Sequence, residues 1–273
     1  MEIQLFLNSI ESICSTKEGI KELKTKILDL AIRGILVPQH KADVHASELM
    51  QKVEENRVNM EKNKIISKQK KVPVIESTPF EIPKSWIWVQ TQDAGEIQLG
   101  RQRAPKYDQG PHMTPYLRVA NVQDGFIDTS DVKEMNFDPV EQKKYSLRPM
   151  DLLLNEGGLV GRTSLYNQEL PFACFQNSIL RFRCFDGIMP EYMFIVFRHY
   201  FYTGRFKEAA TKTTIAHLGA TRLAAIEVPI PPTKEQERIV SKVGEIWQLI
   251  ENIENFGQIE KEASESLSRT RFW

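Results

Sequence analysis

The chain has 273 residues, of which 41% are hydrophobic and 26% charged, so it can bury a core and is too apolar to be disordered throughout. Lysine plus arginine and aspartate plus glutamate both number 36, which excludes nucleic-acid binding by bulk positive charge but permits a local basic surface. The three cysteines form no close CxxC pair, which disfavours a zinc ribbon or a disulfide scaffold, and no apolar run reaches roughly 18 residues, so we expect a cytoplasmic protein without a membrane span.

Residues 1–37 are expected to form one long helix. Its apolar side chains recur at steps of three, four and seven, at Phe6, Ile13, Ile20, Leu23, Ile27 and Leu30. This spacing predicts a single apolar stripe, which Gly34 and Pro38 end with residues that stop helices. The length of the stripe favours a partner helix, although a surface helix lying along its own domain would show the same pattern.

Residues 38–85 are expected to connect this helix to the next unit. A short amphipathic helix is predicted from Ala46 to about Lys64, with an apolar side formed by Leu49, Val53 and Met60. The basic stretch 62–71 that follows either is simply solvated or contacts phosphate. Three prolines then favour an extended path, at Pro73, Pro79 and Pro83.

Residues 86–232 are expected to form a mixed α+β globular domain, because short β-rich runs alternate with glycine-containing turns. The candidate strands are 116–122, 151–154, 163–166, 178–182 and 225–230. One helix is predicted from Pro190 to about Thr203, with proline at its start.

Residues 233–273 return to a helical pattern. Thr233 and Gln236 have the spacing of a capping box. A second apolar stripe follows, at Ile239, Val243, Ile246, Ile250 and Ile253. The expected fold is therefore α+β, with one mixed globular domain flanked by two long helices whose stripes pair as an antiparallel coiled coil, within one chain or between two.

No catalytic motif stands out. There is no GxxxxGK[ST] phosphate loop and no Asn/Asp-Pro-Pro-aromatic loop of an amino-methyltransferase. Asp128, Glu141 and Lys143 match a nuclease pattern only weakly. The histidines lack metal-site spacing, so we expect surface or capping roles for His40, His45, His112, His199 and His217. No catalytic residue and no metal ligand is predicted.

Several segments in chain order share a recognisable pattern. They are ILDLAIRGILVPQ at 27–39, ASEL at 46–49, FEIPKSW at 80–86, PYLRVANV at 115–122, DLLL at 151–154, GRT at 161–163, KTT at 212–214 and IPPTKEQ at 230–236. Together they resemble the DNA specificity subunit of type I restriction–modification enzymes. The resemblance covers nearly the whole chain.

The resemblance implies a non-catalytic subunit that selects double-stranded DNA for two adenine-methylating modification subunits and a restriction subunit. S-adenosylmethionine, ATP and Mg would then belong to those partners, and this chain would bind no cofactor. It further implies an N-terminal spacer helix at 1–37, a connector at 38–85, a target recognition domain at 86–232 and a C-terminal spacer helix at 233–273.

Typical family members carry two recognition domains, whereas this chain has one and therefore resembles a half-subunit. A homodimer of such chains would read a target with two inverted, identical halves. Three alternatives stay open, namely a fragment of a longer product, a truncated or decoy specificity subunit, and a coiled-coil adaptor that binds protein rather than DNA.

The expected DNA-binding residues are basic and small polar side chains in three loops and one strand. They are Arg101, Gln102, Arg103, Lys106, Arg118, Arg162, Thr163, Lys212, Thr213 and Thr214. Guanidinium and amide groups can form paired hydrogen bonds with guanine, adenine and phosphate. The alternatives are a solvated loop at 100–106, strand-end capping by Arg162 and turn chemistry at 212–214, and Asn121 is expected to brace a turn rather than to touch a base.

Overall fold

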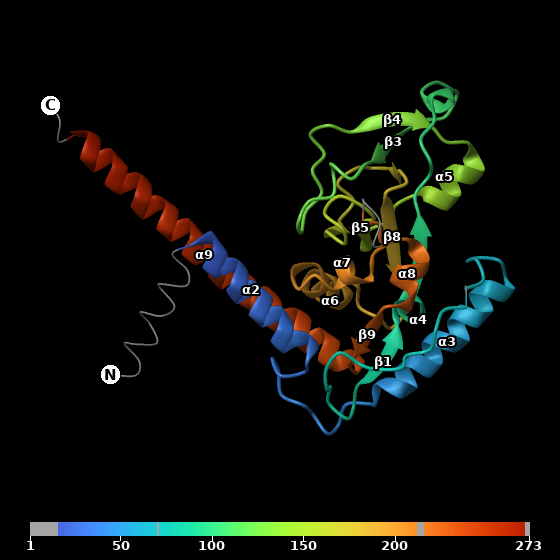
Figure 1. Ribbon diagram of the computed structural model, residues 1–273, viewed down its shortest axis with the longest axis horizontal. Coiled ribbons are helices and arrows are strands. Elements are labelled where there is room, and N and C mark those ends of the chain that lie inside the picture. Colours follow the sequence, from blue (N-terminus) through green and yellow to red (C-terminus); the bar gives the residue numbers. More distant parts are fainter. Residues whose placement is uncertain (1–15, 70, 212–215, 271–273) are drawn as a thin grey trace.

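The computed structural model describes residues 16–69, 71–211 and 216–270, with side chains up to residue 254. The helices are α2 Lys17–Ile32, α3 Ala46–Lys62, α4 Thr91–Ala94, the 3-10 helix η1 Pro105–Tyr107, α5 Pro139–Tyr145, α6 Pro190–Tyr202, α7 Arg205–Ala209, α8 Ala220–Ala225 and α9 Thr233–Thr270. The strands are β1 Ile87–Gln90, β2 Gly95–Leu99, β3 Met113–Leu117, β4 Lys133–Asn136, β5 Asp151–Asn155, β6 Thr163–Tyr166, β7 Cys174–Phe175, β8 Ile179–Cys184 and β9 Glu227–Ile230. Figure 1 shows a globular head, residues 87–230, and a helical rod, α2 with α9, that projects from it.

The head is built from three small sheets. A four-stranded antiparallel sheet in the order β2-β8-β5-β6 is its centre, and a three-stranded sheet in the order β4-β3-β7 lies beside it. β1 and β9 form a separate antiparallel pair, in which Ile87 lies opposite Ile230. This pair brings the two ends of the head together, so α9 leaves the head close to the point where the connector enters it.

The central strand β5 is buried along its whole length because both faces of its sheet are covered. Leu152 and Leu154 belong to the larger buried cluster, which includes α6, whereas Leu153 belongs to the cluster that includes β3 and β7. Alternate residues of a strand point to opposite faces, so the continuous apolar run DLLL is that of a strand enclosed between two layers.

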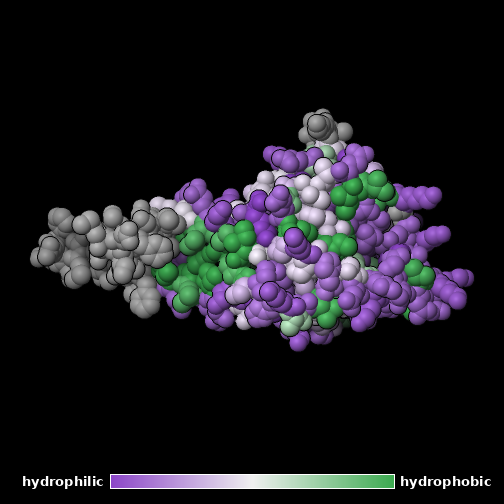
Figure 2. Space-filling model, turned by 90° about the horizontal axis from the view of Figure 1, so that it is seen from below, coloured by the Kyte–Doolittle hydropathy of each residue, from purple (hydrophilic) through white to green (hydrophobic). Residues whose placement is uncertain are grey.

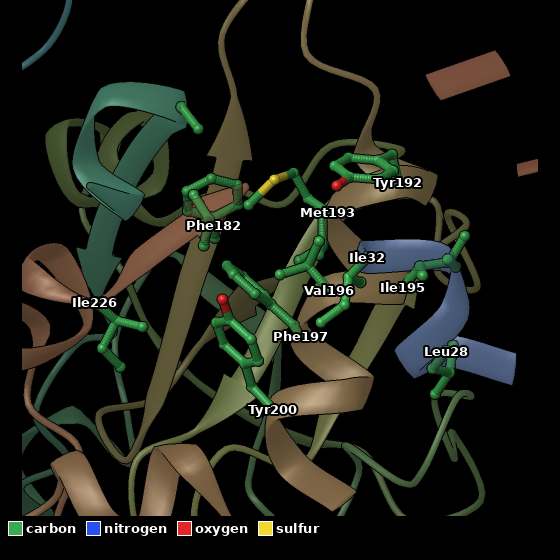
Figure 3. Close-up of a cluster of buried hydrophobic side chains, with 14 of the residues drawn as sticks. Leu28, Ile32, Phe182, Tyr192, Met193, Ile195, Val196, Phe197, Tyr200 and Ile226 are labelled. Carbon is green, nitrogen blue, oxygen red and sulfur yellow. The ribbon is translucent and has the colours of Figure 1, made fainter. Parts of the chain in front are cut away.

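Helix α6 is the middle layer between the sheet and the rod. Figure 3 shows its buried side chains between Phe182 of β8 on one side and Leu28 and Ile32 of α2 on the other. The rings of Phe182 and Phe197 pack edge to face with centroids 5.1 Å apart, an arrangement that aromatic pairs favour. The mixed globular domain predicted for this part of the chain is therefore confirmed.

The N-terminal helix differs from its prediction. Thr16 has extended backbone and its hydroxyl accepts a hydrogen bond from Gly19 N at 3.0 Å, so this helix begins at Lys17. A single continuous helix through residues 1–37 is therefore wrong, because Thr16 is extended and caps the helix that follows it. The helix ends at Ile32 and Gly34 follows with φ +69°, as the stop signal predicts. Phe6 and Ile13 lie outside the described residues.

Helix α2 packs against two neighbours, α6 of the head and α9. Figure 1 shows it antiparallel to the inner part of α9, which continues beyond it, and Lys24 Nζ lies 3.1 Å from Glu254 Oε2. The buried members of the two predicted stripes are Ile20, Ile27, Ile239, Val243 and Ile250, while Leu23, Leu30 and Ile246 are half-buried and Ile253 is exposed. Much of the predicted seam is thus covered within one chain, and α2 shares its apolar face between the rod and the head.

The start of α9 at Thr233 agrees with the sequence pattern, but the predicted capping box is wrong. The Gln236 amide accepts from Met189 N at 2.8 Å and donates to Pro231 O at 3.1 Å. Both ends of this buried amide are therefore used to fasten α9 to the loop before α6, rather than to cap its own helix.

The connector packs along the head. Helix α3 begins at Ala46, as predicted, and the His45 side chain caps it by accepting from Ser47 N at 3.1 Å. Val53 of its apolar side is buried, and Leu49 and Met60 pack against the same cluster. The capping role expected for His45 is confirmed, whereas His199 is buried on α6 against Asp29 of α2, contrary to its expected surface or capping role.

The predicted strands at 151–154, 163–166 and 178–182 are confirmed with small changes of boundary. The strand predicted at 116–122 begins at Met113 and ends at Leu117, where the chain turns away. The first part of the run 225–230 is the end of α8, and only Glu227–Ile230 pairs as a strand. Strands β1, β2, β4 and β7 were not predicted, because they are short and their alternation is weak.

Candidate nucleic-acid interface

Loops of the head meet at one end of the four-stranded sheet. We call this surface the loop end and define it as residues 100–108, 156–162, 176–178 and 216–218. Backbone hydrogen bonds join the first three loops: Arg101 N to Phe175 O at 3.1 Å, Asn177 N to Arg101 O at 2.8 Å and Glu156 N to Ser178 O at 2.8 Å. Leu218 N donates to Glu156 O at 2.8 Å and so adds the fourth segment.

Two glycines permit this close approach of loops. A Cβ on Gly100 would lie 2.1 Å from the Gln176 carbonyl oxygen, so no other residue fits there without a backbone shift. A Cβ on Gly157 would lie 3.2 Å from the His217 ring. Glycine is therefore used at the loop end where one segment passes directly against another.

Arg101 is placed inside the head rather than on its surface. Its side chain is 5% exposed, and its Nε lies 2.8 Å from Glu141 Oε1. Its guanidinium also stacks over the Tyr107 ring, 3.4 Å from the centroid. Because these contacts occupy the guanidinium, the geometry argues against base reading by Arg101.

The rest of the same loop faces solvent. Gln102, Arg103 and Lys106 are exposed. Arg103 makes one ion pair, 3.4 Å from Asp108, in which both side chains are about half exposed, at 56% and 46%. A pair of this kind contributes little to stability, so the Arg103 guanidinium can exchange Asp108 for another anion at small cost.

Arg118 and Asn121 shape the turn after β3. Asn121 Oδ1 accepts from Arg118 N at 2.8 Å, and its Nδ2 donates to Asp128 O at 2.8 Å. The bracing role expected for Asn121 is therefore confirmed. Arg118 Nη2 donates to Asp131 Oδ2 at 2.7 Å, and this hydrogen bond lowers the pKa of Asp131. Arg118 thus acts within the turn.

Arg162 and Thr163 also make internal contacts. Arg162 donates to Gln123 Oε1 at 3.1 Å and to Val119 O at 3.2 Å, and burial lowers its pKa. Thr163 is fully buried, with its hydroxyl donating to Gly161 O at 2.8 Å. The structural alternative for Arg162, bracing at a strand end, fits these contacts better than a grip on phosphate.

Lys212, Thr213 and Thr214 lie outside the described residues. Their neighbour His217 is exposed at the loop end, and Asn177 is half-buried there. Sequence reasoning did not single out these two residues as DNA contacts, because neither stands in a basic or glycine-opened pattern. Only the pairing of loops reveals their position, with Asn177 N bonded to Arg101 O and the His217 ring against Gly157.

The loop end therefore offers guanidinium, ammonium, amide and imidazole groups on one surface. Such groups hydrogen-bond to base edges and to phosphate oxygens. Burial raises the pKa of the Cys174 thiol to about 12, so this cysteine is no nucleophile. Glu141 of the weak nuclease pattern caps α5 and pairs with Arg101. Among the residues described, no group of His, Cys, Asp and Glu could hold a metal ion, and no helix is long and apolar enough to cross a membrane.

Comparison with solved structures places the fold in a known class. A chain from a structure concerned with assembly and conformational transition of a type I restriction–modification system matches 82% of this chain and 55% of its own, with 19% identity and a TM-score of 0.56. The HsdS subunit from Thermoanaerobacter tengcongensis matches over 77% of this chain and 50% of its own, with 19% identity and a TM-score of 0.50. These likenesses show the fold alone.

The sequence comparisons identify the family. Residues 83–262 match the type I restriction modification DNA specificity domain, and the chain belongs to this family. The EcoAI specificity subunit of Escherichia coli is 26% identical over 247 residues, which are 87% of this chain and 41% of that protein. The resemblance inferred from the motifs, to the DNA specificity subunits of type I restriction–modification enzymes, is thus confirmed at the level of the family. The chain spans less than half the length of this curated relative.

Proposed function

We propose that this chain is a half-subunit, in which a single head reads one half of a bipartite DNA target. The observation that carries the proposal is the exposure of Gln102, Arg103 and Lys106 at one end of a rigid sheet. Loops held by a rigid scaffold are the usual place for recognition residues. The head would insert this loop end into the major groove, with exposed basic side chains on phosphates.

A second copy of the chain would supply the other half-site. The rod still carries exposed apolar side chains after α2 has packed, with Leu249 61% and Ile253 40% exposed on α9. Figure 2 shows apolar surface along the part of the rod next to its outer end. Residues four apart lie on one face of a helix, so Leu249 and Ile253 form a continuous strip that a second rod could cover.

Pairing of two identical rods about a two-fold axis sets the form of the target. Two identical heads related by this axis would read inverted, identical half-sites around a spacer that neither head contacts. The 38-residue helix α9 would be about 57 Å long at 1.5 Å per residue, so the rods would fix the distance between the heads.

The proposed partners are modification subunits that methylate adenine and a restriction subunit. S-adenosylmethionine, ATP and Mg would be bound by these partners, since this chain is assigned no chemistry. The family membership supports this division of labour.

Mass measurement of the purified chain tests the pairing. We expect two copies for the wild type and one for a variant carrying Leu249→Lys and Ile253→Lys, because two buried charges would oppose the interface. Gln248→Lys adds one such charge about 100° around the helix from Leu249 and should leave the dimer intact. A wild-type chain that stays monomeric, or a double variant that stays dimeric, contradicts this interface.

A gel shift with the modification subunit present tests DNA reading. We expect a complex on a subset of duplexes that survives competition by unrelated DNA, and Arg103→Ala should weaken it. Assembly without any DNA binding would favour the protein-binding adaptor. Assembly that blocks methylation by an intact specificity subunit would favour the decoy.

A further inference from the structure

A tight hairpin beside the loop end is fastened to helix α6. Residues 121–128 form this hairpin, in which Val122 bridges to Ile127 and Gln123 N donates to Phe126 O at 3.0 Å. Asp124 at the tip points to α6, where its Oδ1 lies 3.1 Å from Arg198 Nη2 and its Oδ2 accepts from the Tyr202 hydroxyl at 2.6 Å. The tip is therefore held by two side chains of one helix.

Arg198 also faces the rod. Its guanidinium lies 5.4 Å from the Phe194 and Tyr202 ring centroids and 5.9 Å from that of Trp247 on α9. Its side chain is only 12% exposed, which strengthens cation–π attraction through partial desolvation. One side chain of the head thus contacts the hairpin on one side and the rod on the other.

Trp247 is well placed to set the direction of the rod. It lies 14 residues beyond Thr233, about 21 Å along α9 from the point where the helix leaves the head. A helix held at its base and at a second point along its length cannot swing freely. Helix α2, which contacts both α6 and α9, supplies a further brace.

We propose that Arg198 is a positioning residue that sets the angle between rod and head, and thereby the spacer length that the assembled protein accepts. This inference rests on the proposed reading of a bipartite target. A displacement of one base pair is about 3.4 Å, which over a rod of about 57 Å corresponds to a swing of only about 3–4°. Because so small a swing matters, we expect spacer selectivity to change when the Arg198 contact is lost, even though the base of the rod and α2 still hold it.

Arg198 makes two sets of contacts, one with Asp124 of the hairpin and one with Trp247 of the rod, and removing each should have a different effect. Trp247→Leu removes the cation–π contact of Arg198 with the rod and leaves its ion pair with Asp124. We therefore expect adjacent spacer lengths to be accepted while the half-site bases stay the same. Asp124→Asn weakens the hold of Arg198 on the hairpin, which contacts the loop end through the hydrogen bond from Arg162 to Gln123 Oε1, and should change half-site preference while the spacer stays the same. Arg198→Met removes both sets of contacts and should change both the accepted spacer lengths and the half-site preference.

The experiment uses the full chain co-expressed with its modification subunit in cells that carry a random plasmid pool, and methylated adenines are mapped by sequencing. The wild type should give one spacer length, and Arg198→Met and Trp247→Leu should each add spacers one base pair longer or shorter at a tenth or more of the sites. Arg205→Met is the matched control. Arg205 pairs with Glu227 at 2.5 Å and stacks over the Tyr200 ring, 5.1 Å from its centroid, and neither partner belongs to the hairpin or to α9.

Arg198→Lys and Trp247→Phe keep the charge and the ring, respectively, and should retain the single wild-type spacer. These conservative variants, together with a thermal melt of every variant, distinguish the loss of the Arg198 contacts from a general loss of folding. A single unchanged spacer in both Arg198→Met and Trp247→Leu, with the wild type selective, overturns this inference alone. A wild-type complex that methylates without any motif overturns the proposed function, and this inference with it.

Discussion

Arg101 and Glu141 form an ion pair inside the head, with Arg101 Nε 2.8 Å from Glu141 Oε1, although Arg101 stands in a basic, glycine-opened loop. The Tyr107 ring covers the guanidinium from within the same loop. Arg101 therefore holds the loop in shape, and its neighbour Arg103 presents the charge to solvent.

Substitution of Arg101 should affect stability, whereas substitution of Arg103 should affect DNA binding. Arg101→Met leaves Glu141 without its partner and should lower the free energy of unfolding by about 2 kcal/mol, less than for a fully buried pair because Glu141 is 27% exposed. Arg103→Ala should leave stability within about 0.5 kcal/mol and weaken DNA binding instead. Urea unfolding and gel shifts measure the two effects, and a stable Arg101→Met with impaired binding would reverse the assignment.

Two glycines of the loop after β5 should differ sharply. A Cβ on Gly161, at φ +78°, would lie 2.3 Å from the buried Phe206 ring, so Gly161→Ala should cost about 3 kcal/mol through strain and overpacking. Gly158, at φ +69°, has nothing within 4 Å, so Gly158→Ala should cost only about 1 kcal/mol. Equal shifts in denaturation midpoint would contradict the close packing of Gly161 on α7.

The contact between α2 and α6 should weaken in acid. Burial lowers the pKa of His199, partly opposed by Asp29, whose Oδ1 lies 3.4 Å from His199 Nε2. Burial disfavours the Asp29 carboxylate, but the hydrogen bond and charge of Arg33 outweigh it, so the pKa of Asp29 is lowered too. The unfolded chain then binds more protons than the folded one, and the free energy of unfolding should fall as the pH drops below about 6.5.

His199→Gln should remove the histidine part of this dependence. Thermal melts between pH 5 and pH 7 should show a smaller slope of midpoint against pH for the variant than for the wild type. His217→Gln changes an exposed histidine and serves as the control. Identical slopes in wild type and His199→Gln would show that the α2–α6 contact does not carry the effect.

Asn121 should be a main support of the turn after β3. It makes three hydrogen bonds from a 2% exposed side chain, to Arg118 N, Asp128 O and Asp131 O. Asn121→Ala leaves Arg118 N and Asp128 O without their side-chain partner, while Asp131 O keeps the Arg118 guanidinium, and the change should cost about 2–3 kcal/mol. Thr129→Ala, an exposed change in the same turn, should cost almost nothing, and a comparable loss in both variants would argue against the bracing role.

The elements with a strong local signal could be predicted from the sequence. The apolar run at 151–154 and the proline that opens α6 mark their elements correctly, because burial and backbone restriction act at those residues themselves. The weak strands were missed, since their pairing depends on residues far along the chain. The two-residue strand β7, for example, pairs with Leu117 and Tyr116 of β3.

The candidate site was only partly predictable for a similar reason. Sequence reasoning singled out the loop at 100–106, which the structure exposes in part, but charge pattern alone cannot distinguish an arginine held inside from one at the surface. Arg101, Arg118 and Arg162 each have an internal partner that is distant in sequence: Glu141, Asp131 and Gln123. The contacts of Arg198 were not predicted because its partners come from a hairpin and a rod that only the fold brings together.

Sequencing of methylated adenines after co-expression with the modification subunit tests the central claim most directly, namely that a non-catalytic head selects the DNA. The account predicts one motif, made of two identical, inverted half-sites around an unread spacer, that disappears when this chain is omitted. Methylation without a motif would contradict DNA reading by the head, and a motif with two different half-sites would contradict pairing with a second copy.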